Sequence, residues 1–492
     1  MTALAAALPL GLVLGAMGLL HWSAARAGVL GLAAALILAL TLFAPLSGGA
    51  LETLTGAGAE ALHSTATILW IVLPALMLYE FQSRTGALDR IRDALTGLTA
   101  DRRLQAILIA WFFGLFMEGA AGFGTPVALA APLLAGLGYP PVRAVTLALT
   151  GHAAGVSFGA VGTPTLAQID LTGLSPTALA GSAALLHAGV SPLLLLVTVR
   201  LAGDGPLARS DYGWAALAWA CFALPSVALA SLAGPELPSL GGALIGLAVF
   251  ATLLIRRTGA TPPALAPLAQ DLAPYGAILA LVLATRLMGP LQETLSGLSL
   301  DWSLAGDRFS GGFAPLYHPG TLLFAGLALG ALATSRQGAL TPSLSAALAR
   351  LVPVALALLA MLALSRVMVH GGLIDALAEA AATTGALWPL LAPLIGVLGT
   401  FVTGSATASN ILFTEFQTGV AASLSLPPVA MAAAQSFGSA IGNVIAPHNI
   451  IAGSATVGLV GKEGEVLAKT LWLCAAAALA GGALILAVTA LA

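Results

Sequence analysis

The sequence predicts an all-α polytopic membrane protein, with about twelve transmembrane helices and two re-entrant hairpins. Hydrophobic residues make up 59% of the 492 residues and charged residues only 8%, whereas an ordinary soluble domain is about one quarter charged. A chain so poor in charge cannot cover its surface in water, so lipid must be the solvent for most of it. Apolar runs of spanning length follow one another along the chain with no long polar segment between them. We therefore expect one transmembrane domain over residues 1–492.

The predicted spans begin with the first apolar run, Leu4–Leu20. No Lys or Arg precedes this run, so we expect a retained span rather than a signal peptide. Apolar runs of roughly 17–25 residues mark the twelve predicted helices. They lie at about 4–20, 27–45, 64–82, 142–164, 178–201, 213–232, 238–257, 273–289, 317–335, 351–370, 428–448 and 467–491.

Two further apolar stretches, 103–138 and 386–425, are interrupted near their middles. Glu118-Gly119 breaks the first and Thr403-Gly404 breaks the second. The arms that follow the breaks are short, which predicts hairpins that enter and leave the membrane on one side. Irregular backbone at membrane depth is tolerated only where protein or a water-filled cavity surrounds it.

The distribution of charge in the loops predicts the orientation. One side collects 15 of the 18 basic residues, namely Arg26, Arg84, Arg90, Arg92, Arg102, Arg103, Arg143, Arg200, Arg209, Arg256, Arg257, Arg336, Arg350, Lys462 and Lys469. The loops of the other side hold Arg308 with Glu52, Glu60, Asp170, Glu236, Glu293, Asp301 and Asp307. By the positive-inside rule the basic side is cytoplasmic, which places both termini outside.

Three blocks of sequence recur in the same order at offsets of 285 to 287 residues. The blocks at Thr85–Ile91, Glu118-Gly119 and Pro140–Gly155 match Gly371–Leu377, Thr403-Gly404 and Pro427–Gly442. This predicts two repeats, at 64–170 and 350–450. Seven predicted spans separate their starts, and an odd number inverts the second repeat. Inverted repeats with paired broken helices are a transporter architecture, with the binding site near mid-membrane.

Four segments carry the predicted chemistry, namely Glu118–Pro126, Gly151–Pro164, Thr403–Asn410 and Gln435–Asn449, and the second and fourth are expected to break at Gly151–Gly155 and Gly438–Gly442. Glycines free the backbone, Pro126 suits the start of a half-helix, and unpaired N–H groups at a helix start attract anions. Together with hydroxyls and amides, such groups suit a small anionic solute, although Gly-xxx-Gly spacing also serves helix packing. The candidate binding residues are Gly119, Gly122, Gly124, Thr125, Gly151, Ser157, Thr403, Gly404, Ser405, Thr407, Ser409, Asn410, Ser436, Ser439 and Asn443.

Glu118 is the candidate proton carrier, because ionisable groups at membrane depth are costly and usually functional. A structural hydrogen bond to the loop is the alternative. His152 can relay protons or be a buried histidine with satisfied partners, and His187 is expected to be packed. Arg366 can attract an anion or extend to the interface. Glu415 is a further titratable group of the second hairpin.

Several other functions are disfavoured by the sequence. A net charge of −2 excludes a strongly basic nucleic-acid binder. The two cysteines lie in separate apolar runs, and no metal or cofactor motif is present. Gly155–Gly159 fits the G-x-S-x-G pattern of hydrolases, but that pattern needs a strand-to-helix turn rather than a membrane segment. We expect no enzyme; an intramembrane hydrolase using Ser157 and a passive channel remain alternatives.

Segments in both repeats resemble the bacterial lactate permease family. The resemblance rests on Glu118–Pro126 with Gly-x-Gly-Tyr-Pro-Pro downstream, on Thr403–Asn410 and on the closing run Ala455–Glu465. It implies proton symport of L-lactate, with D-lactate and glycolate as related substrates, across the bacterial inner membrane. It also implies kinship to ion transporters with inverted repeats and hairpins. A homodimer is one possible assembly.

The chain departs from the family pattern at a few positions. Ser405-Ala406 stands where a serine-aspartate pair is common, and His152 and His448 stand where amides are expected. The missing carboxylate leaves Glu118 as the stronger coupling candidate. Gluconate, a dicarboxylate or another small organic anion is the alternative substrate, and sodium is the alternative coupling ion.

Overall fold

A computed structural model describes nearly the whole chain. The residues outside the described part are Met1, Leu19, His21, 44–48, Phe123, Ala260, Asp307, Val460, Gly461 and Ala492. Some predictions extend onto them, namely the predicted spans 4–20 and 27–45, the segment 118–126, the loop residue Asp307 and the run 455–465.

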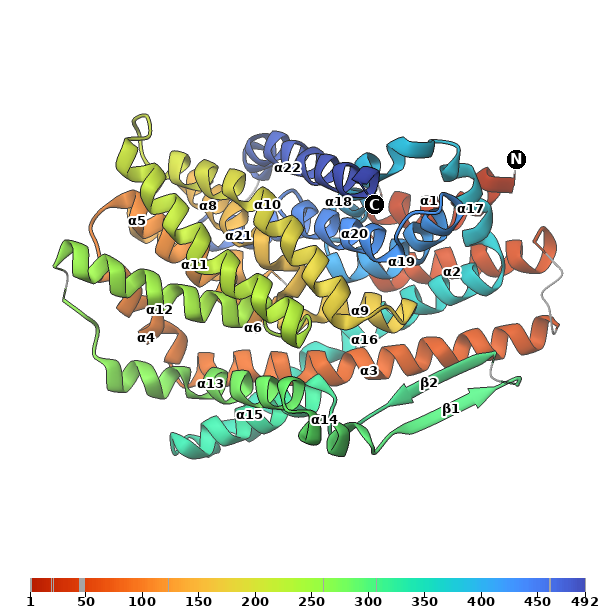
Figure 1. The fold of residues 1–492 in the computed structure, drawn as a ribbon, viewed down its shortest axis with the longest axis horizontal. Coiled ribbons are helices and arrows are strands. Elements are labelled where there is room, and N and C mark those ends of the chain that lie inside the picture. Colours follow the sequence, from red (N-terminus) through yellow and green to blue (C-terminus); the bar gives the residue numbers. More distant parts are fainter. Residues whose placement is uncertain are drawn as a thin grey trace.

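Most of the long helices lie side by side along the long axis of the molecule (Figure 1). The first half comprises α1 (Thr2–Gly18), α2 (Ala24–Thr41), α3 (Ala50–Arg84), α4 (Ala87–Thr96), α5 (Arg102–Ala106), a π-helical segment (Ile107–Phe113), α6 (Gly114–Ala120), α7 (Thr125–Gly136), α8 (Pro141–His152), a 3-10 segment (Ala153–Phe158), α9 (Gly159–Thr172) and α10 (Pro176–Ala202).

The middle and the end of the chain continue the helical pattern. They comprise α11 (Arg209–Ala233), α12 (Pro238–Thr258), α13 (Leu265–Leu287), α14 (Gly289–Ser296), α15 (Pro319–Ala333), α16 (Leu340–His370), α17 (Leu373–Ala382), α18 (Trp388–Thr403), α19 (Ala406–Ser423), α20 (Pro428–Gly442), α21 (Pro447–Thr456) and α22 (Glu463–Leu491), with short 3-10 turns at Gln337–Ala339 and Gly385–Leu387.

Twelve helices among the described residues are long and apolar enough to cross a membrane. The set differs from the prediction at four places. The predicted spans 4–20 and 317–335 form shorter apolar helices, at Thr2–Met17 and Pro319–Ala333. The first arms of the two predicted hairpins, Arg102–Ala120 and Gly385–Thr403, reach spanning length instead. The polytopic helical fold is thus confirmed, while re-entrance and the outward termini stay proposals.

Two predicted spans, each with an expected glycine-rich break, are divided into two helices. In place of 142–164, α8 ends at His152, and the backbone of Ala160, Val161 and Gly162 is left-handed before α9 continues. In place of 428–448, α20 ends at Gly442 and α21 starts at Pro447. Left-handed backbone is unfavourable for Ala and especially for β-branched Val. Such strain persists only where the surrounding structure holds it, and it is frequent at functional sites.

Among the described residues, a small β-hairpin that the sequence did not predict is the exception to the helical pattern. Strands β1 (Leu300–Leu304) and β2 (Phe309–Phe313) pair antiparallel, with Leu300 opposite Phe313. Phe309 is fully buried against α3, where a Cβ added at Gly56 would lie 2.3 Å from its ring. The hairpin therefore depends on a long-range contact that local patterns do not reveal.

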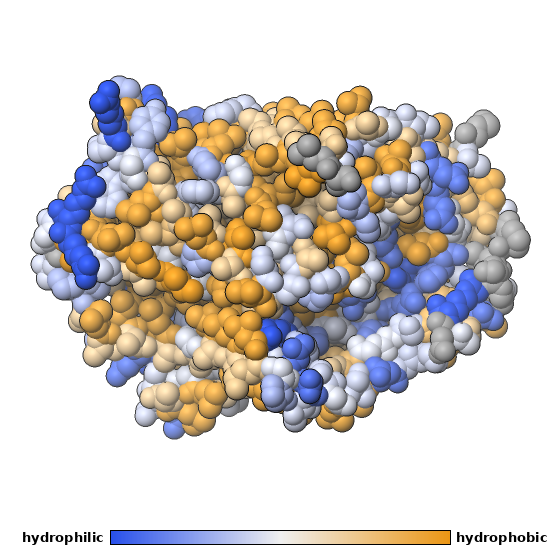
Figure 2. Space-filling model, viewed as in Figure 1, coloured by the Kyte–Doolittle hydropathy of each residue, from blue (hydrophilic) through white to orange (hydrophobic). Residues whose placement is uncertain are grey.

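The order of elements supports the proposed repeats. A long helix, a short helix, a broken helix pair and a second broken pair occur in α3–α9 and again in α16–α21. The two long helices, α3 and α16, pack along each other. Apolar side chains cover most of the face shown in Figure 2, and polar ones gather toward its left and right edges. This surface fits a helical bundle surrounded by lipid.

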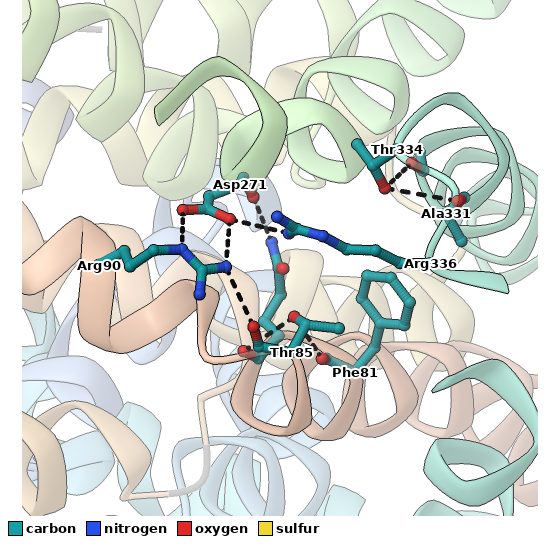
Figure 3. Close-up of polar contacts among 9 residues, drawn as sticks. Phe81, Thr85, Arg90, Asp271, Ala331, Thr334 and Arg336 are labelled. Carbon is teal, nitrogen blue, oxygen red and sulfur yellow. Dashed lines mark hydrogen bonds and ion pairs between the residues drawn. The ribbon is translucent and has the colours of Figure 1, made fainter. Parts of the chain in front are cut away.

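A buried carboxylate joins the helices on the predicted cytoplasmic side (Figure 3). Asp271 of α13 is 0% exposed and accepts hydrogen bonds from Arg90 Nη2 at 2.6 Å and from Arg336 Nη1 at 2.8 Å. Its backbone carbonyl accepts from Gln82 Nε2 of α3 at 2.7 Å. The contacts connect α13 with α3, with α4 and with the turn after α15.

We expect Asp271→Asn to destabilise the protein by about 3 kcal/mol, because two guanidinium groups would lose a buried counter-charge. Their partial exposure, 45% for the Arg90 side chain and 22% for that of Arg336, keeps the loss at the low end. Thermal unfolding in detergent measures it. Asp204→Asn is the matched control, because Asp204 pairs with Arg143 at the surface, and it should leave the melting temperature unchanged. Equal melting curves for both variants would contradict the assignment.

Candidate functional site

All four interrupted segments meet at one cavity of about 240 Å³. Its walls come from the α6–α7 break, the start of α9, the α18–α19 break and the α20–α21 break. The lining residues are Glu118, Gly122, Gly124, Val156, Gly159, Ala160, Thr163, Pro164, Thr403, Gly404, Ser405, Ala406, Thr407, Asn443, His448 and Asn449.

Four helices begin at the cavity wall. The right-handed part of α9 begins at Thr163, and α7, α19 and α21 begin at Thr125, Ala406 and Pro447. The start of an α-helix carries unpaired N–H groups and the positive end of the helix dipole. No lysine or arginine lines the cavity in the described part of the chain. The helix starts therefore attract a small anion without a fixed cation, which suits a solute that must also be released.

The α18–α19 break offers hydroxyl groups to this cavity. Gly404 adopts a left-handed backbone, with φ of 72°, that turns the chain between the two helices. Ser405 caps α19 by accepting a hydrogen bond from the Ala408 amide at 3.3 Å, so its hydroxyl proton is free to donate. The Thr407 hydroxyl has no partner among the described residues. Both can donate to a carboxylate.

Glu118 lies at the end of α6 and is only 4% exposed. Its Oε1 covers Gly159, where an added Cβ would lie 2.1 Å away. No hydrogen-bond donor of a described residue reaches the carboxyl group. A buried charge without a donor is costly, so proton uptake at Glu118 removes a charge that its surroundings do not balance.

His152 is the neighbour of Glu118 behind the lining. Its Nδ1 donates to the Ala148 carbonyl at 2.6 Å, which leaves Nε2 of the neutral ring as an acceptor. This Nε2 lies 3.8 Å from Glu118 Oε2. A proton on Glu118 therefore faces a nitrogen that can share it.

Other predicted site residues lie outside the lining and make internal contacts. Gly119 packs on the Leu240 backbone and Gly151 on the Ala110 carbonyl. Thr125 donates to the Gly122 carbonyl, Ser409 to Gly396, Asn410 to Pro164 and Ser439 to Ser436. These contacts stabilise the individual segments, and the bond from Asn410 to Pro164 also joins α19 to α9. Direct contact of these residues with a solute stays a prediction.

Ser157 and His187 form a buried pair next to the site. Ser157 Oγ lies 2.8 Å from His187 Nε2 and donates to the Ser436 carbonyl at 3.0 Å. His187 Nδ1 has no hydrogen-bond partner among the described residues, whereas the histidine of a hydrolase triad is oriented by an acid. The pair links α10 to the breaks.

Arg366 is not free to attract an anion from solution. Its Nη2 lies 2.7 Å from Glu415 of α19 and its Nη1 lies 3.6 Å from Glu60 of α3. Glu60 also bonds to His370 at 2.7 Å. These charges form a largely buried network that connects α19 to α3 and α16.

The predicted set of binding residues leaves out several lining residues, although most of them lie in the four segments singled out from the sequence. His448 and Asn449 come from the start of α21, and Gly159, Ala160 and Thr163 surround the left-handed turn. Thr163-Pro164 repeats the Thr-Pro pair at the start of α7. That pair was the available signal for a second helix start.

Comparison with known proteins identifies the family to which the chain is similar. The model of the family described as L-lactate permease matches residues 2–260 and 308–491. The L-lactate permease of Salmonella typhimurium is 30% identical over 82% of this chain and 81% of its own length. The glycolate permease GlcA of Escherichia coli is 27% identical over 84% and 83%. The structure of Neisseria gonorrhoeae MtrF, from a class of antimetabolite efflux pumps, shares the fold, with a TM-score of 0.52, 16% identity and 96% coverage of both chains.

Proposed function

The chain belongs to the L-lactate permease family, and from this premise we propose that it is a proton-coupled symporter of L-lactate and related 2-hydroxy monocarboxylates, including D-lactate and glycolate. We place it in the bacterial inner membrane. The observation that carries the proposal is the cavity formed by four helix starts, with Glu118 as the one carboxyl group among its described lining residues.

Substrate binding uses the positive side of this cavity. The carboxylate of the substrate accepts hydrogen bonds from the Ser405 and Thr407 hydroxyls and from the N–H groups at the start of α19. Asn443 and Asn449 are amide partners for the 2-hydroxyl group. All of these groups are neutral, so the solute is held without a permanent ion pair.

Proton coupling follows from electrostatic repulsion inside the cavity. Two negative charges in a poorly solvated space repel each other strongly. The substrate anion therefore binds well only when Glu118 carries a proton, with His152 Nε2 as its neighbour. Linkage is reciprocal, so the bound proton favours the anion and the bound anion favours the proton.

Uptake into proteoliposomes tests this proposal. We expect radiolabelled L-lactate to accumulate when the lumen is alkaline relative to the outside, and an inward sodium gradient at equal pH to produce no accumulation. Uptake driven by sodium alone would contradict proton coupling. Inhibition by gluconate or a dicarboxylate, with no inhibition by glycolate or D-lactate, would contradict the proposed substrate class.

A further inference from the structure

A second cavity of about 250 Å³ adjoins the proposed substrate site. Four residues, Thr163, Thr403, Ser405 and Thr407, line both cavities. The rest of its lining comes from α2, α3, α16 and α19, and consists of Ala24, Ile68, Val72, Pro353, Val354, Ala357, Leu358, Met361, Ala408 and Ile411.

The second cavity is apolar beyond the shared wall. No charged or amide side chain belongs to its described lining. The Thr163 hydroxyl donates to the Ala160 carbonyl at 2.6 Å and the Thr403 hydroxyl to the Gly399 carbonyl at 2.7 Å. Because these two hydroxyls bond to backbone carbonyls, the two threonines present their methyl groups to the second cavity.

The inner end of the cavity lies within the protein, because Ile68, Met361 and Ile411 are at most 1% exposed. On the α16 side the lining reaches Pro353, which is exposed. The end of the cavity that is shared with the anion site is built from the α18–α19 break, which presents Ser405 and Thr407. A solute whose carboxylate occupies the first cavity therefore has non-polar space next to it.

From this arrangement we propose that the second cavity receives the aliphatic side chain of 2-hydroxy acids longer than lactate. The inference rests on the proposed function and extends its substrate class to 2-hydroxybutanoate, 2-hydroxypentanoate and 2-hydroxy-4-methylpentanoate. The carboxylate and the 2-hydroxyl group remain in the polar cavity. The alkyl chain extends past the residues shared by the two cavities and occupies the second cavity. Each added methylene should tighten binding about fourfold while the cavity has room.

Competition against radiolabelled L-lactate uptake tests the proposal. We expect inhibition to strengthen about fourfold per methylene from lactate to 2-hydroxypentanoate. Ala357→Leu fills the cavity from α16 and should weaken inhibition by 2-hydroxypentanoate about tenfold or more, while the KM for L-lactate changes less than about twofold. Ala355→Leu adds the same side chain to the same helix outside the cavity lining, and it should behave as the unmodified protein.

Two outcomes would overturn this inference and leave the proposed function intact. One is L-lactate uptake that longer acids inhibit no better than lactate itself. The other is an Ala357→Leu variant in which L-lactate uptake and inhibition by the longer acids weaken equally. That result would indicate a passage for the substrate rather than a binding site for its alkyl chain. Ligand-induced thermal stabilisation separates the remaining case, because a protein that responds to none of these acids would overturn the proposed function and the inference together.

Discussion

Replacing Glu118 with glutamine is expected to abolish pH-driven accumulation of L-lactate while lactate–lactate exchange continues. Glutamine has the shape and the neutral charge of the protonated glutamate, so the anion still binds. It cannot release a proton, so the proton gradient no longer drives transport. We expect accumulation to fall about 10- to 100-fold, the range of a typical coupling free energy between two sites. Uptake and counterflow in the same proteoliposomes measure the two activities.

Glu80→Gln is the matched control for this substitution. Glu80 is another largely buried carboxylate, but it lies on α3 and pairs with Arg350 at 3.0 Å and Arg84 at 3.5 Å. Its loss should leave coupled uptake within about twofold, as expected for a partly exposed ion pair. Coupled uptake that is unchanged by Glu118→Gln would remove Glu118 from the coupling role.

Adding a single methyl group at Gly159 is expected to disrupt the same site. The Cβ of Gly159→Ala would lie 2.1 Å from Glu118 Oε1 and 3.1 Å from its Cδ, so the carboxyl group must leave its place beside the helix starts. Overpacking of this kind costs about 1–3 kcal/mol, which corresponds to roughly 5- to 150-fold in affinity or rate. Uptake kinetics and thermal unfolding measure the two consequences.

Combining Gly159→Ala with Glu118→Ala separates a steric conflict with the carboxyl group from general destabilisation. Gly159→Ala should destabilise the protein when Glu118 is present and have little effect when Glu118 is already alanine, because the conflicting atoms are then absent. Gly276→Ala is the control, since a Cβ at Gly276 meets nothing within 4 Å. Equal destabilisation by Gly159→Ala in both backgrounds would show that Glu118 is not its contact.

The positions of the helix breaks were largely predictable, because glycine and proline act locally. Glu118–Pro126 and Thr403–Asn410 contain the residues that end one helix and start the next, and the structure divides the helices there. The break after His152 was placed a few residues too early. Its turn depends on left-handed Ala160 and Val161, and neither residue type prefers that backbone.

The cavity lining was less predictable, because it depends on which face of each short helix turns inward. Gly119 follows Glu118 directly, yet it packs on Leu240, 121 positions along the chain. Asn449 lines the cavity because α21 packs against α7. A local pattern contains no information about such pairings between distant segments.

Membrane character, the approximate spans, the helix breaks and the family all follow from the sequence by itself. They depend on hydrophobic length, on glycine and proline, and on short motifs, which are local properties of the chain. Only the tertiary structure brought the four breaks to one cavity, set Glu118 against Gly159 and His152, and placed Arg366 in an ion-pair network. Those features arise where segments from tens to hundreds of residues apart pack together, and packing is decided by the complementarity of whole helix faces.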